Sequence, residues 1–520
     1  MTDVAAPSTV GFIDIGTNSI RLLVVRLHRN RAYTVIHQLK ETVRLGEDAF
    51  RHQHLRVDAM DRAVAVLRQF AMLARAAGAG EIIAVATAAT REAENQRVFL
   101  DRLRDEADLD VHVISGLEEA RLIYAGVASG LHLGPRRGLF IDIGGGSTEV
   151  SIGNEAGQDF LTSLPLGAIR LSDQFLSHHT GSVSTRTYEH LRSFVRSEVA
   201  QELRQLRQLK PNVAIGSSGT IENLADVASY LMYGESGRVN EGLSLTDLQR
   251  TISHLRSLSL DERRKVPGLN PGRADIIIGG AAILEVLMED TGVRELQVSG
   301  RGLREGLLTD YLQRHGHADL VGGDSVRRRS VLQLGRRCNF DEAHADATAR
   351  LAVELFDSAK AAGLHSAGDA VRELLEYAGL LHHIGAFLTY SGYQRHSEYL
   401  IRNAELLGFD ETEIAMIATI VRFHRNAIPR ANERALAEFA PKDRAAIRVA
   451  SILLRLAEGL DRSQAQVVGS ATLERLDRDR VVLHVAVKPG WEVELGGLDT
   501  HRRAFAKVFG ATLMIEAVPA

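Results

Sequence analysis

The stretch GLFIDIGGGSTEVSIG, residues 138–153, decides the fold of this chain. Apolar residues lead into Asp142-Ile143-Gly144, small polar residues follow, and an alternating apolar stretch resumes at Val150. Alternation of this kind on both sides of a glycine-rich turn is typical of two strands joined as a hairpin. The pattern therefore predicts a hairpin whose tip is polar.

A second copy of the pattern, GFIDIGTNSIRLLVVRL, lies at residues 11–27. Asp14 and Asp142 hold the same place in the two copies and are 128 residues apart. A motif repeated at about the length of a domain indicates two related α/β halves. A cleft between these halves would present both hairpin tips to one ligand.

The character of the sequence changes after about residue 311. Apolar residues then recur at helical spacing in four stretches: 345–362, 370–382, 411–423 and 444–460. After about residue 470, strand-like runs at 481–487 and 513–517 flank an expected helix at 500–509. We therefore expect four domains: two α/β domains at 1–130 and 131–312, an all-α domain at 313–468, and a small α+β domain at 469–520.

The composition sets limits on the class of protein. A chain of 520 residues is too long for one hydrophobic core. Its formal net charge of −4 argues against a dedicated duplex nucleic-acid binder. The sequence has no run of 18 apolar residues, and its N-terminus lacks the basic region of a signal peptide. The single cysteine, Cys338, rules out an internal disulfide framework. We expect a cytoplasmic protein with no transmembrane segment and no specific nucleic-acid partner.

The turn at residues 142–149 carries the strongest chemical signal. Three glycines in a row, Gly144 to Gly146, remove side chains, so that backbone amides can converge on an anion. Ser147 and Thr148 add hydroxyl donors, and Asp142 and Glu149 bracket the turn with carboxylates. Carboxylates beside a phosphate cradle suit a hard cation such as Mg²⁺. A dinucleotide-binding motif needs a helix after its glycines, and a strand is expected here instead.

The turn at residues 14–19 is the matching half of the predicted clamp. Thr17, Asn18 and Ser19 could hydrogen-bond a second phosphate, and Arg21 follows two residues later. On its own this turn would be as compatible with a plain hairpin as with a site. Its position in the repeat favours the site.

Four other segments join a strand to a helix, and each has a plain structural alternative. Ser115 is a candidate N-cap before Glu118 and Glu119, whose carboxylates could complement a helix dipole or activate water. Arg91 ends a strand and could bind phosphate or lie in solvent. The segments 216–220 and 299–305 could be anion sites, through Gly219, Thr220 and Arg304, or simple β–α turns.

Taken together, these segments resemble the exopolyphosphatase/guanosine pentaphosphatase (Ppx/GppA) family. The resemblance rests on five motifs: DIGTNS at 14–19, SGLEEARLIY at 115–124, DIGGGSTE at 142–149, GSSGT at 216–220 and SGRGLREG at 299–306. It implies duplicated actin-like (ribonuclease H-like) ATPase domains of α/β class with an interdomain cleft. An all-α HD-like domain and a small α+β C-terminal domain would follow.

The resemblance also implies roles for particular residues. Glu119 matches the catalytic base, and Asp142 and Glu149 match acidic positions that bind Mg²⁺ or another divalent cation. The resemblance and the motifs described above together predict twelve phosphate-binding residues: Asn18, Ser19, Arg21, Arg91, Gly144, Gly145, Gly146, Ser147, Thr148, Gly219, Thr220 and Arg304.

The helical region resembles an HD phosphohydrolase domain with an altered metal site. His344, His382 and Asp461 fall where metal ligands are expected, but His383 replaces the aspartate of the HD pair, so we expect a degenerate site. His396 and His424 could still complete a mixed cluster, or the histidines could line a cleft without metal. Five arginines concentrate here, as a solvated helix face or as a track for a polyanion: Arg395, Arg402, Arg422, Arg425 and Arg430.

The expected function is the release of terminal orthophosphate from inorganic polyphosphate, and possibly from guanosine pentaphosphate (pppGpp), by water that Glu119 activates. Three alternatives stay open: pppGpp hydrolysis as the main activity, a kinase of the same superfamily, and a non-hydrolytic regulatory protein that binds (p)ppGpp. A homodimer is expected, since a second subunit could extend a polyanion groove.

Overall fold

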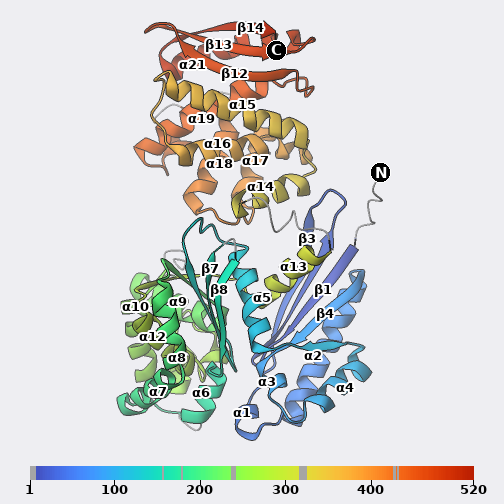
Figure 1. The fold of residues 1–520 in the computed structure, drawn as a ribbon, viewed down its shortest axis with the longest axis vertical. Helices are drawn as coiled ribbons and strands as arrows, with labels where there is room; N and C mark the ends of the chain where they lie inside the picture. Colours follow the sequence, from blue (N-terminus) through green and yellow to red (C-terminus); the bar gives the residue numbers. More distant parts are fainter. Residues whose placement is uncertain are drawn as a thin grey trace. The chain divides into compact units, whose positions relative to one another are not determined.

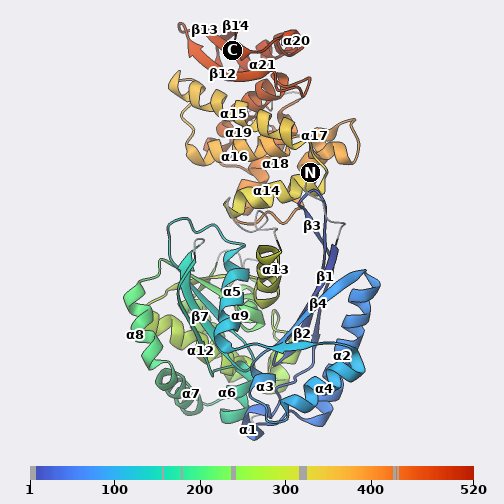
Figure 2. The same ribbon diagram turned by 45° about the vertical axis from the view of Figure 1, so that its right-hand side comes forward.

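The computed structural model divides the chain into two compact units, shown in Figures 1 and 2. The first unit comprises residues 1–29 and 33–323, and the second comprises residues 30–32 and 324–520. The structure describes residues 8–154, 157–176, 180–235, 242–315, 325–425, 429 and 433–519. Arg430, one of the five arginines named above, lies outside the described residues.

The first unit begins with a five-stranded sheet built on the hairpin at residues 11–27. Its strand order is β3-β2-β1-β4-β5. Strands β1 and β2 are antiparallel, with Asp14 opposite Arg21, whereas β4 is parallel to β1. The strands are β1 (Ser8–Ile15), β2 (Ser19–Leu27), β3 (Tyr33–Thr42), β4 (Ala79–Ala86) and β5 (Val111–Val113).

The second sheet repeats this order. It runs β8-β7-β6-β9-β11, with a short sixth strand, β10, added at the β11 edge. Asp142 lies opposite Glu149 in the β6–β7 hairpin, as Asp14 lies opposite Arg21 in the first copy. The strands are β6 (Gly138–Ile143), β7 (Thr148–Asn154), β8 (Gly157–Leu164), β9 (Val213–Ser217), β10 (Leu243–Ser244) and β11 (Glu295–Val298). The predicted duplication of an α/β half, and with it the actin-like fold, is confirmed.

Helices cover the outer faces of both sheets (Figures 1 and 2). On the first sheet, α2 and α4 bury Leu67, Phe70 and Phe99. On the second, α12 is apolar on all sides and buried along most of its length, as expected of a helix inside a core. The outer helices are α1 (Ala49–His52), α2 (Val57–Ala76), α3 (Ala88–Arg91), α4 (Gln96–Ala107), α6 (Ala168–Phe175), α7 (Thr185–Glu198), α8 (Ala200–Leu209), α9 (Ser218–Tyr233), α10 (Leu245–Ser257), α11 (Leu260–Arg263) and α12 (Ile277–Thr291).

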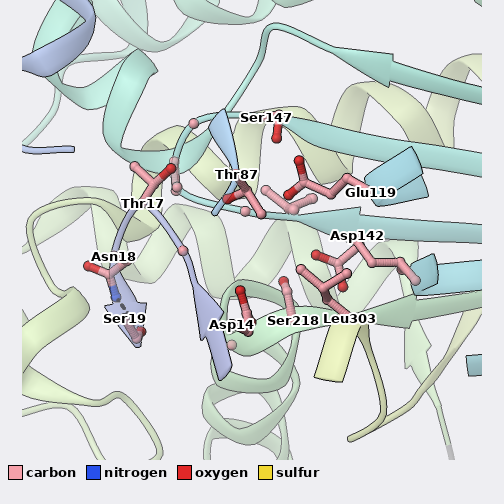
Figure 3. A pocket seen from close by; sticks show the side chains of 18 of the residues that line it. Asp14, Thr17, Asn18, Ser19, Thr87, Glu119, Asp142, Ser147, Ser218 and Leu303 are labelled. Atoms are coloured by element: carbon pink, nitrogen blue, oxygen red, sulfur yellow. Dashed lines mark hydrogen bonds between the residues drawn. The ribbon is translucent and has the colours of Figure 1, made fainter. Parts of the chain in front are cut away.

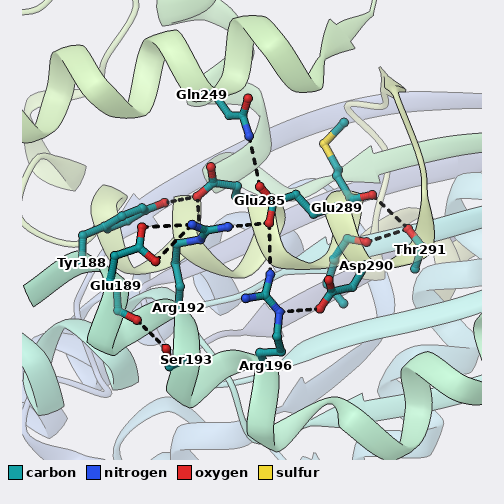
Figure 4. Close-up of polar contacts among 12 residues, drawn as sticks. Tyr188, Glu189, Arg192, Ser193, Arg196, Gln249, Glu285, Glu289, Asp290 and Thr291 are labelled. Atoms are coloured by element: carbon teal, nitrogen blue, oxygen red, sulfur yellow. Dashed lines mark hydrogen bonds and ion pairs between the residues drawn. The ribbon is translucent and has the colours of Figure 1, made fainter. Parts of the chain in front are cut away.

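One charged network ties α7 to α12 (Figure 4). The buried carboxylate of Glu285 accepts a hydrogen bond from the Tyr188 hydroxyl at 2.8 Å and pairs with Arg192 at 3.2 Å. Arg196, one turn further along α7, pairs with Glu289 at 3.0 Å. A buried charge needs such partners. The network therefore accounts for an acid on an otherwise apolar helix.

Two helices, α5 (Gly116–Ala128) and α13 (Leu303–Arg314), pack on each other between the two sheets. Their apolar side chains share one core with Phe12 from the first sheet and with Phe140 and Ile215 from the second. This shared core joins the two halves of the first unit, so that the hairpin tips of both halves meet on one side of it.

The contact between α5 and α13 depends on two glycines. A Cβ atom at Gly306 would lie 1.9 Å from the Leu122 carbonyl oxygen, and one at Gly126 would lie 2.2 Å from the Gly302 carbonyl oxygen. Neither helix backbone can move away without opening the core around Tyr311 and Phe12, whose rings pack edge to face. Only glycine allows this close approach.

We predict that Gly306→Ala lowers the free energy of unfolding of the first unit by about 1–3 kcal/mol, the usual cost of overpacking a core. Urea denaturation followed by circular dichroism measures it. Gly300→Ala is the matched control, because nothing lies within 4 Å of a Cβ atom at Gly300. Equal stability of Gly306→Ala and the control would contradict the packing described for α5 and α13.

The second unit is helical and ends in a three-stranded sheet. Strand order is β12-β13-β14, with β13 antiparallel to β12 and parallel to β14. Leu473 and Leu483 of this sheet share a core with Leu355 and Ala359 of α15. The elements are α14 (Val326–Arg337), α15 (Glu342–Ala361), α16 (Asp369–Leu381), α17 (Tyr393–Arg402), α18 (Glu411–Phe423), α19 (Pro441–Gly459), β12 (Val468–Arg475), β13 (Arg480–Val487), α20 (Glu492–Leu498), α21 (Arg502–Phe509) and β14 (Thr512–Pro519).

The sequence patterns had indicated β13, β14 and the helix between them, but not β12. In that strand the buried residues Ala471 and Leu473 alternate with the polar residues Thr472 and Glu474, so its apolar signal is short. Among the described residues, no helix combines the length and the apolar character needed to cross a membrane.

Candidate active site

The two hairpin tips line one pocket (Figure 3). Asp14 and Asn18 come from the β1–β2 hairpin, and Asp142 and Ser147 come from the β6–β7 hairpin. Glu119 enters from the first turn of α5. The start of α9 and the residue Arg273, on a short 3₁₀ helix (Pro271–Arg273), complete the lining. The pocket thus lies where the sequence predicted a clamp.

Both hairpin tips are closed by the same hydrogen bond. The amide of Gly16 donates to the Ser19 carbonyl at 3.1 Å, and the amide of Gly144 donates to the Ser147 carbonyl at 2.9 Å. The carbonyls of Gly144 and Gly145 also accept hydrogen bonds from the first amides of α6. The amides of Gly145 and Gly146 donate no hydrogen bond to another described residue. They are therefore available to an anion in the pocket.

The glycines also let the two tips touch. A Cβ atom at Gly145 would lie 3.0 Å from Thr17 Cβ, and one at Gly146 would lie 2.9 Å from Thr17 Oγ1 and 2.3 Å from the Phe50 ring. Side chains at these positions would force the tips apart. The glycines therefore serve the contact between the two halves as well as the anion cradle.

Carboxylates gather at the pocket. Burial raises the pKa of Asp14 to about 6 and also raises the pKa of Asp142, whose carboxylate accepts a hydrogen bond from the Ser217 hydroxyl. Burial, followed by the charges of Glu119 and Asp142, raises the pKa of Glu149 well above its ordinary value. Like charges held close together in a dry site resist ionisation unless a cation joins them. A cation bound among these acids would favour their ionised forms.

Glu119 has one cationic partner, Arg91. Burial raises the pKa of Glu119 to about 7, and the nearby Arg91 charge opposes this rise. The Arg91 guanidinium donates to the Glu119 carboxylate at 3.0 Å and to the Ile114 carbonyl at 2.9 Å. The Ser115 hydroxyl accepts from the Glu118 amide, which confirms Ser115 as the N-cap of α5. Glu118 itself pairs with Arg121, so Glu119 is the acid that lines the pocket.

Two arginines line the pocket together with these acids. Arg21 and Arg273 line the pocket, and within the part of the chain that the structure describes neither forms an ion pair. Burial and the neighbouring Arg21 lower the pKa of Arg273 to about 10. A Cβ atom at Gly219 would lie 2.5 Å from the Arg273 guanidinium, so Gly219 makes room for that side chain. Unpaired guanidinium groups beside an anion cradle suit a phosphate ligand.

Arg273 was not predicted from the sequence. Its segment, Asn270-Pro271-Gly272-Arg273, shows only a capped turn, in which the Asn270 side chain accepts from the Gly272 amide at 2.9 Å. Asp14, Thr87 and Ser218 also line the pocket but were not among the expected site residues. Asp14 had a signal, because it occupies the place of Asp142 in the repeat.

Ten of the fifteen predicted site residues line the pocket: Asn18, Ser19, Arg21, Glu119, Asp142, Gly144, Gly145, Gly146, Ser147 and Gly219. The other five lie behind this lining. Glu149 is buried, and its carboxylate accepts a hydrogen bond from the Ser163 hydroxyl at 2.8 Å. It interacts electrostatically with Glu119, which does line the pocket. Arg91 is engaged by Glu119.

Three predicted phosphate contacts need correction, because protein atoms already occupy the side chains. Thr148 is fully buried and donates its hydroxyl to the Leu166 carbonyl at 2.7 Å. The Thr220 hydroxyl accepts from Arg273 at 3.5 Å and does not line the pocket. Arg304 pairs with Glu305 at 2.7 Å. These residues support the lining residues without forming part of it.

The donor set fits a hard divalent cation held together with a substrate. Mg²⁺ keeps several waters and is usually bound by one or two carboxylates plus phosphate oxygens. Asp14 and Asp142 provide two such oxygen donors in the pocket, and burial raises the pKa of both. Within the described residues, no three His, Cys, Asp or Glu side chains converge to hold a metal by themselves. Substrate oxygens would complete the coordination.

The histidines of the second unit form a buried chain. His344 contacts Asp461 through Nδ1 at 2.8 Å, and its Nε2 lies 3.2 Å from Nε2 of His382. Burial lowers the pKa of both His382 and His424. His383 lies against Tyr393, with ring centroids 4.4 Å apart. Because no metal-holding group of three forms here either, the HD-like character of this region stays a prediction.

The arginines of this region are partly neutralised. Arg422 pairs with Glu398 at 2.7 Å, and Arg402 pairs with Glu438 at 2.8 Å. Arg425 lies over the rings of Tyr390 and Tyr393. Ion pairs of this kind weaken the case for a continuous cationic track on the second unit.

Comparison with known proteins agrees with this architecture. Residues 24–315 match the Ppx/GppA phosphatase family, and residues 326–501 match Ppx/GppA phosphatase, domain III. An exopolyphosphatase from Cytophaga hutchinsonii is 28% identical, with a TM-score of 0.55 over 59% of this chain and 98% of its own. A Ppx/GppA family member from Aquifex aeolicus is 26% identical, with a TM-score of 0.50 over 60% of this chain and 99% of its own.

The duplicated actin-like fold, together with a pocket that combines free backbone amides, carboxylates and guanidinium groups, defines a phosphatase. The chain belongs to the Ppx/GppA phosphatase family. The family match at residues 24–315 falls almost entirely within the first unit, and the match to domain III at residues 326–501 falls within the second.

One ion pair joins the halves of the first unit beside the pocket. Arg44 donates two hydrogen bonds to Asp275, both at 2.7 Å, and a third to the Gly272 carbonyl at 2.6 Å. Because Gly272 and Asp275 flank Arg273, this bidentate contact fixes the segment that carries the pocket arginine.

We predict that Arg44→Gln and Asp275→Asn each destabilise the first unit, and that the double variant loses less than the sum of the two. A coupling of about 1 kcal/mol is expected for a partly exposed pair. A double-mutant cycle by urea denaturation measures it, with the exposed Arg264–Asp261 pair as the control cycle. Strict additivity at Arg44 and Asp275 would show that the pair does not hold the halves together.

Proposed function

We propose that this phosphatase releases terminal orthophosphate from inorganic polyphosphate, and from the triphosphate end of pppGpp, by in-line attack of water. The observation that carries the proposal is Glu119, a buried carboxylate at the pocket whose pKa is raised to about 7. A general base works best when its pKa lies near the working pH. The similar protein from Cytophaga hutchinsonii is an exopolyphosphatase, which supports the same substrate class.

Each lining group has a role in this mechanism. The amides of Gly145 and Gly146 hold the terminal phosphoryl group, and the Ser147 hydroxyl, which hydrogen-bonds Glu149, supports the lining beside them. Arg21 and Arg273 stabilise the charge that spreads onto the phosphoryl oxygens and the leaving phosphate. Glu119 orients the attacking water and accepts its proton at the carboxylate. Because phosphoryl transfer has a loose transition state, positioning and charge stabilisation account for most of the catalysis.

Asp14 and Asp142 would hold Mg²⁺ or another divalent cation, with Glu149 supporting from behind the lining. When bound, such a cation neutralises charge on the phosphoanhydride. The proposal thus keeps Asp142 in its predicted metal role, adds Asp14, and moves Glu149 out of direct contact with the pocket.

The alternatives make different demands on the pocket. A kinase needs an acceptor site and transfers phosphate to a small molecule. A regulatory (p)ppGpp-binding protein needs no base, whereas Glu119 is held by Arg91 at the pocket with a pKa near neutrality. Orthophosphate release from polyphosphate and from pppGpp, measured side by side with Mg²⁺ varied, distinguishes the candidates. A cytoplasmic location and a homodimer remain part of the proposal and rest on the sequence patterns alone.

We predict that Glu119→Gln keeps substrate binding but lowers kcat by about 10²–10⁴-fold, the usual contribution of a general base. Orthophosphate release and equilibrium binding of polyphosphate measure the two effects. Glu118→Gln is the matched control, because Glu118 lies one position earlier and pairs with Arg121 outside the pocket. Near wild-type turnover in Glu119→Gln would remove Glu119 from this role.

The pH dependence follows from the same ion pair. Glu119 acts as a base only when it is ionised, so kcat/KM should rise with pH up to about 7 and then level off. Arg91→Gln removes a charge that lowers the pKa of Glu119, so the acidic limb of the profile should move to higher pH. Arg91→Lys keeps the charge and should leave the limb near its original place. A limb that does not move in Arg91→Gln would exclude Glu119 as the titrating group.

A further inference from the structure

Lys40 does not itself line the pocket; it lies on β3, a strand to which no role has yet been assigned. It is directly opposite Arg21 in the antiparallel β2–β3 ladder. Opposite residues of such a ladder point to the same face of the sheet, with Cβ atoms about 5 Å apart. Arg21 lines the pocket, and Lys40 is the next cation outward because β3 is the edge strand of the first sheet.

The charges around Lys40 are almost all positive. The cations that act on its ammonium group are Arg21, Arg273 and Arg304, and the acid that does so is Glu222. Arg304 is already paired with Glu305. Within the described residues, Arg21, Lys40 and Arg273 form no ion pair. Three cations without paired acids therefore extend from the glycine turns to the open edge of the sheet.

The crowding of positive charges disfavours the protonated form of Lys40 in the free protein. Burial and the Arg21 charge lower the pKa of Lys40 to about 8, since a further positive charge is disfavoured beside guanidinium groups. An anion lying over the three cations would relieve the repulsion. Lys40 is nonetheless exposed, so a ligand can reach it from solvent.

We propose that Lys40 binds an internal phosphate of the substrate, and that the oligophosphate chain leaves the glycine turns over Arg21 and crosses the β3 edge at Lys40. The inference rests on the proposed function and specifies its substrate as an oligophosphate chain of at least three phosphates. The terminal phosphate lies at Gly145 and Gly146, the next one faces Arg21 and Arg273, and the one after it faces Lys40. A lysine ammonium suits this outer position, because it binds phosphate as a point charge and adapts to successive groups of a moving chain.

The test compares Lys40→Gln, Lys40→Arg and the control Lys210→Gln in orthophosphate release from long-chain polyphosphate with Mg²⁺. Lys210 is an exposed lysine at the end of α8 that does not line the pocket. For Lys40→Gln we expect KM to rise by about tenfold, the loss of one charge-assisted hydrogen bond, with kcat within about twofold of wild type. Lys40→Arg and Lys210→Gln should keep the wild-type KM. The difference in KM between Lys40→Gln and wild type should become smaller as the salt concentration is raised, because salt screens the charge of Lys40.

The second part of the test varies the number of phosphates in the ligand. Pyrophosphate has no third phosphate, so its inhibition constant as a competitor should be the same in wild type and Lys40→Gln. An unchanged KM for polyphosphate in Lys40→Gln, or an equal weakening of pyrophosphate, would overturn the proposal. The same series with pppGpp shows whether a nucleotide triphosphate end uses the lysine too: a rise in KM extends the site to nucleotides, and no rise restricts it to polyphosphate.

A binding arm separates the two proposals. Polyphosphate affinity is measured by calorimetry in Glu119→Gln and in Glu119→Gln/Lys40→Gln, in which turnover is slowed by the loss of the general base. If wild type releases no orthophosphate from polyphosphate, the proposed function fails. A weaker affinity of about tenfold in the double variant would still place the chain at Lys40, and equal affinities would reject it.

Discussion

The close approach of the two hairpin tips is the constraint on which the rest of the site depends. Gly145 and Gly146 lie so near Thr17 that a Cβ atom at either glycine would come within about 3 Å of its side chain. The contact between α5 and α13 brings the tips to this distance, because Gly126 and Gly306 let the two helix backbones approach. The pocket therefore depends on glycines in two places, at the hairpin tips and between these two helices.

The pocket brings together charges of opposite sign. Asp14, Asp142 and Glu119 line it, with Glu149 behind them, and burial raises the pKa of each of these acids. Arg21 and Arg273 also line it, without ion-pair partners among the described residues, and Arg21 lies opposite Asp14 in the β1–β2 ladder. In the free protein, repulsion among the acids and repulsion between the arginines are both unfavourable, since like charges repel in a partly dry site. A cation and a phosphate chain would satisfy both sets at once.

The second unit shows a different use of polar residues. Its histidines are linked to one another and to Asp461, and several of its arginines are paired with acids or packed on aromatic rings. This is the pattern of an internally satisfied interior. The pocket of the first unit, in contrast, leaves the amides of Gly145 and Gly146 without hydrogen-bond acceptors and the guanidinium groups of Arg21 and Arg273 without ion pairs among the described residues, which is why the chemistry is assigned there.

Much of the fold could be predicted from the sequence, because hairpins and helix starts are local. The repeat of residues 11–27 at 138–153 determined the duplicated α/β halves, and the glycines at 144–146 predicted the part of the chain that lines the pocket. Ser115 placed Glu119 in the first turn of α5. Each of these inferences needs only neighbouring residues and the period of a strand or a helix.

Only the tertiary structure decided which side chains face the ligand. Arg273 reaches the pocket from a turn whose sequence shows no phosphate signal, and Arg91 turns from the predicted phosphate to Glu119. Thr148 comes two residues after the last of the three glycines, yet it is buried and its hydroxyl donates to the Leu166 carbonyl. Sequence order fixes the position of a residue along its strand or helix. The packing of distant elements determines whether its side chain meets substrate, solvent or another part of the protein.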